Sequence, residues 1–349
     1  MKYVDMHCDT LYKMLQRKKQ GENVSIAENA GHIDLDKLKR GNALLQNFAM
    51  FVEWKKCDNP KDEVLRMVDL FYAEMEKNRD CILPVRTYDE IMENERNGKM
   101  SALLTIEEGA ACLGDLDNLE LFYDLGVRMM TLTWNYPNEI GYPNLLKVSK
   151  ETKQESAEGD KTGNPGMEKQ VFDYKTPDTE HGLTPFGIQA VERMEELGMI
   201  VDVSHLSDAG FYDVLRATKK PFVASHSNAR ALCPWVRNLT DDMLRSLADR
   251  GGVAGLNFCA DFLTEVELGT YNPGTMEAVI DHARHMINIG GRECLGIGSD
   301  FDGIDTNEGI PDYSYMPKLE EAFNRAGFRE SECDKIFRDN VLRVYREIL

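Results

Sequence analysis

The first residues that could do chemistry stand at the start of the chain, where His7 and Asp9 follow a short apolar stretch beginning at Tyr3. Successive side chains of a strand point to opposite faces, so residues two apart share a face. His7 and Asp9 are therefore predicted to project into the same space. An imidazole beside a carboxylate suits a divalent metal such as zinc. Taken alone, the pair also fits an ordinary hydrogen-bonded or surface pair.

Further polar residues stand at the ends of later apolar stretches, in the same relation to each stretch as His7 and Asp9. They are Glu107, Trp134, His205, His226 and Asp300. His205 and His226 are separated by one strand-plus-helix unit, which predicts that they occupy equivalent points on neighbouring strands. The other histidines do not follow this pattern: 282 and 285 fall within a predicted helix, and 32 and 181 within loops.

The elements that must position these residues are short apolar strands separated by amphipathic helices. Strands are predicted to begin near residues 3, 44, 101, 127, 199, 221, 252 and 294. Alternating strands and helices over this length predict a parallel sheet, and eight units predict an α/β fold closed as a (β/α)₈ TIM barrel. An open parallel sheet would normally show Gly-x-Gly-x-x-Gly after the first strand, and none is present. In a barrel, all of the polar strand ends meet at one rim.

Length and composition fit a single barrel domain over residues 1–349, with a long polar insertion at about 147–182. Such an insertion is usually an active-site lid or a disordered excursion, and both interpretations are open. The chain is 42% hydrophobic, enough for a large core, and its formal charge of −19 argues against a nucleic-acid partner.

The sequence also carries expectations about location. No apolar run is long enough for a membrane-spanning helix, and no charged-then-apolar leader precedes the first strand. The eight cysteines are scattered, with no Cys-x-x-Cys pair. Reduced thiols and the missing leader predict a cytoplasmic protein without a membrane partner.

Three histidines and two carboxylates at one rim are the ligand types that hold two zinc-like ions: His7, Asp9, Glu107, His205 and His226. Glu107, alone on its strand, is the natural bridge. Two metal ions held close together by one bridging carboxylate can share a hydroxide nucleophile and polarise a carbonyl. Each residue also has a simpler interpretation. His205 could be a hydrogen-bonded rim histidine, and Glu107 with Glu108 a solvated helix start favoured by the helix dipole. The metal hypothesis depends on all five residues arriving at the same end of their strands.

At this point the sequence resembles the membrane (renal-type) dipeptidases, the M19 zinc peptidases. The similarity covers nearly the whole chain, with its motifs in the family's order. The matching runs are His-Cys-Asp-Thr-Leu (7–11), Gly-His-Ile-Asp-Leu (31–35), Ile-Glu-Glu-Gly (106–109), Gly-Val-Arg-Met-Met-Thr-Leu-Thr (126–133), Gly-Leu-Thr-Pro-Phe-Gly (182–187), Val-Asp-Val-Ser-His (201–205), Ser-His-Ser-Asn-Ala (225–229), Arg-Asn-Leu-Thr-Asp-Asp (237–242) and Gly-Ser-Asp-Phe-Asp-Gly (298–303).

The resemblance implies a barrel that assembles as a homodimer and hydrolyses small dipeptides through a hydroxide bridging two zinc ions. It assigns His7, Asp9 and Glu107 to one zinc, and Glu107, His205 and His226 to the other. It also implies that Arg237 grips the C-terminal carboxylate of the substrate, a task suited to a planar guanidinium. Asp300 matches the carboxylate that moves protons or holds the substrate amine.

One departure from the family concerns Trp134, which stands where better-known members have a histidine that assists the substrate carbonyl. An indole N–H donates a hydrogen bond but cannot carry a proton. Either Asn135, Tyr136 or another donor takes that role, or the rate or the substrate is altered.

Two alternative functions are also compatible with a barrel. One is another binuclear metal hydrolase acting on a cyclic amide or lactone, and the other is a catalytically silent barrel that binds peptides. The first class commonly begins with His-x-His and bridges its metals through a modified lysine, whereas this chain has His-x-Asp and Glu107. Only Trp134 favours the silent barrel. The family's membrane-anchoring signals are absent, so "membrane" in its name is not expected to apply.

Overall fold

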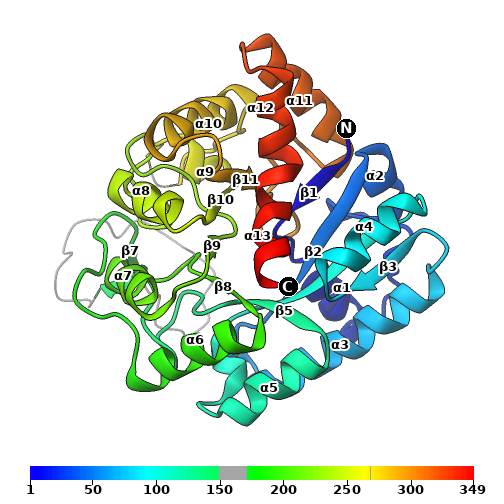
Figure 1. The fold of residues 1–349 in the computed structure, drawn as a ribbon. Helices are drawn as coiled ribbons and strands as arrows, with labels where there is room; N and C mark the ends of the chain where they lie inside the picture. Colours follow the sequence, from blue (N-terminus) through cyan, green and yellow to red (C-terminus); the bar gives the residue numbers. More distant parts are fainter. Residues whose placement is uncertain (149–170, 268) are drawn as a thin grey trace, which may run out of the picture.

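Eight parallel strands form the ring that positions the site (Figure 1). The computed structural model describes residues 1–148, 171–267 and 269–349. Around the ring the strands follow chain order: β1 (Tyr3–Asp5), β2 (Ala43–Phe51), β4 (Met100–Glu107), β5 (Val127–Thr131), β8 (Ile200–Asp202), β9 (Val223–Ala224), β10 (Val253–Leu256) and β11 (Leu295–Ile297). The eight predicted strands and the (β/α)₈ fold are confirmed.

The ring closes where the first strand meets the last. The backbone N–H of Met6 donates to the carbonyl oxygen of Ile297 at 3.0 Å. Beyond the strands, the N–H of Asp300 donates to the carbonyl of His7 at 3.2 Å, and Asp9 N–H donates to the carbonyl of Phe301 at 2.9 Å. These bonds place residues 7–9, near the start of the chain, beside residues 300–301, near its end, at the rim of the barrel.

Most of the helices pack around the outside of the ring (Figure 1). The helices that separate the ring strands include α1 (Thr10–Lys19), α3 (Pro60–Lys77), α5 (Leu116–Asp124), α6 (Pro185–Leu197), α7 (Asp208–Ala217), α8 (Asp241–Asp249) and α10 (Met276–Gly290), and α13 (Asn340–Ile348) ends the chain. Helix α6 is capped at both ends: the Thr184 hydroxyl accepts from Gly187 N–H, and Gly198 ends the helix at φ +77°.

Several elements were not foreseen from the sequence. Strand β3 (Ile82–Val85) borders the first half of β4, whereas β5 borders its second half. The remaining unforeseen helices and short turns are α2 (Leu35–Arg40), α4 (Tyr88–Arg96), α9 (Ala260–Leu263), α11 (Met316–Arg325), α12 (Glu330–Asp334) and the single turns at Trp54–Lys56, Gly109–Cys112, Tyr313–Tyr315 and Lys335–Asp339.

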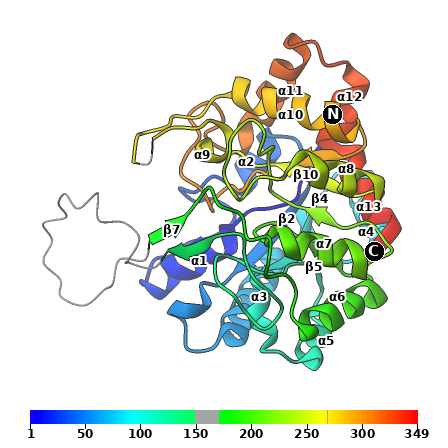
Figure 2. The same cartoon turned by 90° about the vertical axis from the view of Figure 1, so that its left-hand side faces the viewer.

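The predicted insertion at about 147–182 falls partly outside the described residues, which omit 149–170. Its described parts include β6 (Leu146–Val148), which pairs antiparallel with β7 (Val171–Asp173). Figure 2 places β7 on the side of the molecule opposite α13. The next residue, Tyr174, accepts a backbone hydrogen bond from Val236 at 2.9 Å. The end of the insertion is thereby tied to the loop that follows β9.

The end of the barrel opposite the site is filled by α13, which crosses the ring in Figure 1. Its apolar side chains form one buried cluster with inward-pointing residues of the strands, including Val4, Leu45 and Ile200. Gly296 permits this contact, since a Cβ there would lie 2.7 Å from a methyl carbon of Val341. The residues packed around α13 are mainly apolar, whereas the polar strand-end residues lie at the opposite rim.

We predict that Tyr345→Phe lowers the free energy of unfolding by about 1–3 kcal/mol. The Tyr345 hydroxyl accepts a buried hydrogen bond from Asn47 Nδ2 at 2.6 Å, and the substitution leaves that amide without its partner. Tyr271→Phe is the control, because Tyr271 is 73% exposed, and should change stability by less than about 0.5 kcal/mol. Urea titration measures both; equal effects of the two substitutions would contradict the role of this contact.

Candidate metal centre

The five predicted metal ligands and Asp300 come together at the rim formed by the C-terminal ends of the strands. They make three overlapping groups whose possible ligand atoms lie within 4.8 Å of one another: His7, Asp9 and Glu107; Glu107, His205 and His226; and His7, His226 and Asp300. All six side chains are buried. The simpler interpretation of Glu107 as a solvated helix start is therefore wrong.

Glu107, the last residue of β4, lies between two of these groups. Its Oε2 is 3.2 Å from Nε2 of His7. Its Oε1 is 3.0 Å from Nε2 of His205 and 3.6 Å from Nε2 of His226. One carboxylate oxygen thus faces each group, which is the arrangement that a bridging ligand requires.

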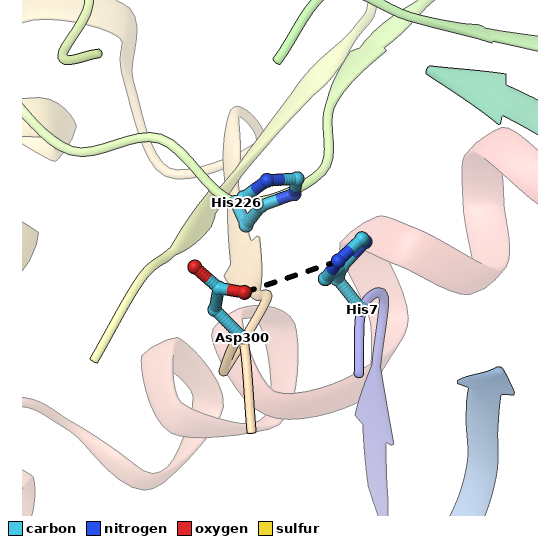
Figure 3. Close-up of side chains that lie close together, drawn as sticks. All are labelled: His7, His226 and Asp300. Carbon is cyan, nitrogen blue, oxygen red and sulfur yellow. Dashed lines mark ion pairs between the residues drawn. The ribbon is translucent and has the colours of Figure 1, made fainter. Parts of the chain in front are cut away.

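Figure 3 shows how His7, His226 and Asp300 converge from three strands. Asp300 Oδ1 lies 3.9 Å from His7 Nε2, and the rings of His7 and His226 are 3.9 Å apart between centroids. Two residues of the wider site follow their strands in a left-handed conformation, His205 at φ +69° and Asp300 at φ +61°. Such a conformation is uncommon outside glycine, and it turns the chain sharply at the strand end.

Hydrogen bonds behind the site fix how two imidazoles are oriented. The Ser225 hydroxyl donates to Asp202 and lies 2.7 Å from His226 Nδ1. Since that hydroxyl proton is already used, Ser225 accepts from His226 Nδ1–H. His205 Nδ1 faces the amide oxygen of Asn135 at 3.1 Å, which likewise requires Nδ1–H. Both Nε2 lone pairs therefore point into the site, as metal-binding histidines require.

Sequence analysis missed Ser225 and Asp202 as residues that orient a ligand. Both stand at a strand end, and Ser225 directly precedes His226, so the rule that identified the ligands could also have found them. Asn135 was expected to bind substrate. The structure places it against His205 and also at the cavity wall.

The donor set fits a divalent cation. With both histidines protonated on Nδ1, two bare nitrogens, His205 Nε2 and His226 Nε2, face each other at 3.1 Å. Both ring nitrogens of His7 and Asp9 Oδ1 are buried without a hydrogen-bond partner among the described residues. Buried polar atoms without partners are costly, and a metal ion shared by imidazole and carboxylate ligands would satisfy them.

The pKa shifts in the cluster also favour a bound cation. Burial raises the pKa of Glu107 to about 8, with His7 opposing and Asp9 adding to the rise. Burial also raises the pKa of Asp300 to about 6. Burial lowers the pKa of His205 and of His226, and nearby positive charges lower both further. Burial alone would lower the pKa of His7, but the negative charges of Glu107 and Asp9 raise it well above the usual value. Negative charge at this depth needs a cation beside it.

A cavity of about 520 Å³ opens above the cluster. Glu107, His205 and Asp300 lie in its floor, and Arg237 and Trp134 are among its lining residues. Aromatic side chains that sequence analysis did not single out also line it: Tyr12, Phe51, Tyr174, Trp235 and Phe262. They come from five separate segments, two of which are the helices α1 and α9, and no motif connects them in the sequence.

The remaining histidines lie away from this cluster. His282 is buried as a packing residue, accepting from Ala229 N–H through Nδ1 and facing the Leu263 carbonyl through Nε2. His285 pairs with Asp241. His181 pairs with Asp178 and is not among the residues that line the cavity.

Comparison with known proteins identifies the family. The family model of membrane dipeptidases, peptidase family M19, matches residues 1–349. The chain belongs to the M19 family. Dipeptidase tcpJ of Claviceps purpurea is a relative, 32% identical over 330 residues, which are 91% of this chain and 70% of that protein. The resemblance seen in the sequence is confirmed.

Two solved structures share the whole fold. One, described as the dipeptidase AC, a metallopeptidase of family M19, is 28% identical, with a TM-score of 0.86 and coverage of 100% of this chain and 98% of that chain. The other is a metallopeptidase from Rhodobacter sphaeroides with a phosphinate mimic of the dipeptide L-Ala-D-Ala. It is 27% identical, with a TM-score of 0.86 and coverage of 100% and 99%.

The family's name refers to membranes, but none of the described helices combines the length and apolar character needed to cross a bilayer.

We predict that the metal-free protein loses stability as the pH rises from about 6.5 to 8. Burial places the pKa of Glu107 at about 8 and that of Glu108 at about 7, both raised from 4.5, so the folded state holds protons that the unfolded state has lost. His7, whose pKa is also raised, acts in the same direction. His205 and His226, whose pKa values are lowered, oppose this loss only weakly, because an unfolded histidine loses most of its remaining charge just above pH 6.5.

Urea titration of chelator-treated protein at the two pH values measures this effect. Saturating zinc should flatten the pH dependence, since a cation stabilises the ionised carboxylates. Stability that rises with pH in the metal-free protein would contradict the electrostatic description.

Proposed function

We propose that this M19 protein is a zinc dipeptidase that uses two metal ions. His7, Asp9 and Glu107 would hold one ion, and Glu107, His205 and His226 the other. The ions would supply activation of a water molecule and polarisation of the peptide carbonyl. The observation that carries the proposal is Arg237, a buried arginine that forms no ion pair with any described carboxylate and lines the same cavity as this ligand set.

Arg237 supports a substrate with a free C-terminal carboxylate. Its side chain is buried, and its Nε and Nη1 have no hydrogen-bond partner among the described residues. Nη2 makes only a long contact of 3.4 Å with the His226 carbonyl, and the guanidinium lies 5.6 Å from the ring centroid of Phe262. A buried guanidinium is costly unless an anion meets it, and a carboxylate matches its two free donors. A peptide bond one residue from that carboxylate would lie over the ligand set.

Asp300 supports the proton transfers that hydrolysis needs. Its Oδ2 accepts from Asn257 Nδ2 at 2.9 Å, which leaves Oδ1 directed at the cluster. Burial raises its pKa to about 6, close to the range in which a carboxyl can both take and give a proton near neutrality. Asp300 would take a proton from the attacking water and deliver one to the leaving amine nitrogen.

Trp134 would form part of the cavity wall and has no proton to exchange. It packs edge-to-face against Phe51 at 4.8 Å and against Tyr136 at 5.6 Å. This apolar wall replaces the histidine expected at this position from the family. The role of that histidine would fall to the metal ions and Asp300.

The relatives support a dipeptide as the substrate. The Rhodobacter sphaeroides structure holds a phosphinate mimic of L-Ala-D-Ala, so a D-residue at the second position belongs in any substrate panel. Homodimer formation and a cytoplasmic location stay predictions from the sequence.

The test compares a dipeptide with its C-terminal amide, using zinc-loaded enzyme. The amide should be the poorer substrate of the native protein, since it offers Arg237 no carboxylate. Arg237→Ala should lower kcat/KM for the free dipeptide by about 10²-fold, a charge-assisted contact being worth roughly 2–3 kcal/mol, and should barely change the value for the amide.

Asp300→Asn is the matched control, because it should lower kcat about 10²–10⁴-fold for both substrates alike. Equal cleavage of free and amidated dipeptides by the native enzyme would show that Arg237 has another task. No hydrolysis of any L,L- or L,D-dipeptide by zinc-loaded protein would overturn the proposed function.

A further inference from the structure

Glu108 is a buried carboxylate that the proposed chemistry does not use. It follows Glu107 in the chain, yet its side chain is fully buried and is not among the cavity-lining residues. Its backbone lies at φ +102°, a conformation that residues with a Cβ rarely adopt. A strained glutamate at such a place requires contacts that compensate for the strain.

Those contacts all come from backbone and amide donors. Glu108 Oε1 accepts from Ala110 N–H at 2.9 Å and from the side-chain amide of Asn138. Its Oε2 accepts from the backbone N–H of Trp134 at 3.2 Å. Two of the three donors belong to the loop that follows β5, residues 132–141, so the carboxylate joins the end of β4 to this neighbouring loop.

Asn138 spreads this hold over the loop. Its Nδ2 also donates to the Leu132 carbonyl at 2.9 Å. Its Oδ1 accepts from Ile140 N–H at 2.8 Å and from Gly141 N–H at 3.0 Å. Both polar atoms of the Asn138 side chain are therefore hydrogen-bonded. Through Asn138, Glu108 is connected to Leu132 near the start of the loop and to Ile140 and Gly141 at its end.

The two contacts of Glu108 lie on either side of Asn135. Trp134 N–H comes just before it, and Asn138 comes three residues after it. Asn135 Oδ1 in turn faces His205 Nδ1 at 3.1 Å, the contact that leaves His205 Nε2 free to bind metal. Trp134, held through its own backbone, forms part of the cavity wall.

We propose that Glu108 is a positioning residue, which holds the 132–141 loop so that Asn135 orients His205. Removing its carboxylate lets Asn135 move away from the imidazole and weakens metal binding at His205. The effect on catalysis rests on the proposed function, but the effect on metal binding does not.

The test is Glu108→Gly, which removes the carboxylate and also relieves the strained backbone. Leu113→Gly is the matched control: Leu113 lies on the same turn, at φ +54°, is 44% exposed and contacts no ligand. Zinc affinity is measured by competition with a chromophoric chelator, alongside kcat, KM and the thermal midpoint. Glu108→Gly should weaken binding of the zinc at Glu107, His205 and His226 about tenfold, at the lower end for residues that orient ligands, and lower kcat with little change in KM. Leu113→Gly should leave zinc affinity and kinetics unchanged.

A double-mutant cycle shows whether Glu108 acts through Asn135. Asn135→Ala should reproduce the loss of zinc affinity, and the double variant should be no worse than either single variant. Losses that multiply, or native zinc affinity in Glu108→Gly, would overturn the inference.

Two further outcomes are also decisive. If Glu108→Gly does not fold, Glu108→Gln keeps the shape but turns an amide N–H₂ toward one of the donors, and it should show a smaller loss of zinc affinity; native affinity there would overturn the inference. Weakened zinc binding in a protein that cleaves no dipeptide would overturn the proposed function and leave this inference standing.

Discussion

The structure depends on how negative charge is buried at the rim of the barrel. Asp9, Glu107 and Asp300 surround His7 away from water, and burial raises the pKa of Glu107 to about 8. Ionised carboxylates that are buried this close together are costly without positive charge beside them, and one protonated imidazole cannot balance all three. The unprotonated Nε2 atoms of His205 and His226 add lone pairs that can bind a metal ion, and they add no charge. The cluster is therefore suited to bind cations. The hydrogen bonds from Asn135 and Ser225 fix the orientation of His205 and His226.

The barrel divides the tasks of stability and chemistry between its two ends. At one end, α13 fills the ring with mainly apolar side chains, and its Tyr345 hydroxyl accepts a buried hydrogen bond from Asn47. At the other end, strands stop abruptly and deliver polar side chains into a cavity walled by aromatic rings. The strained backbones of Glu108, His205 and Asp300 all lie at this second end. Strain of this kind persists where surrounding contacts determine the conformation, which the plugged barrel provides.

Much of this arrangement could be predicted from the sequence. The eight ring strands and the convergence of the candidate metal ligands were predictable because strand period and residue type are local properties, and a parallel barrel gathers strand ends at one rim. Contacts between distant segments were not predictable. Ser225 orients His226 only because Asp202 on the adjacent strand accepts its hydroxyl proton. The left-handed backbone at Glu108 could not be predicted, because the residue there is not a glycine. Strand β3 is short and flanked by polar residues, and it forms a strand because it pairs with β4.

The count of metal ions bound per chain tests the central claim most directly. Zinc-loaded protein, freed of excess metal and measured by elemental analysis, should contain about two zinc ions per chain. Glu107→Gln should lose zinc from both positions, because a neutral amide bridges two cations poorly. Glu76→Gln, on a glutamate whose side chain is 74% exposed, should keep the native content. Zinc content near zero in the native protein, or native content in Glu107→Gln, would contradict a centre built around the Glu107 carboxylate.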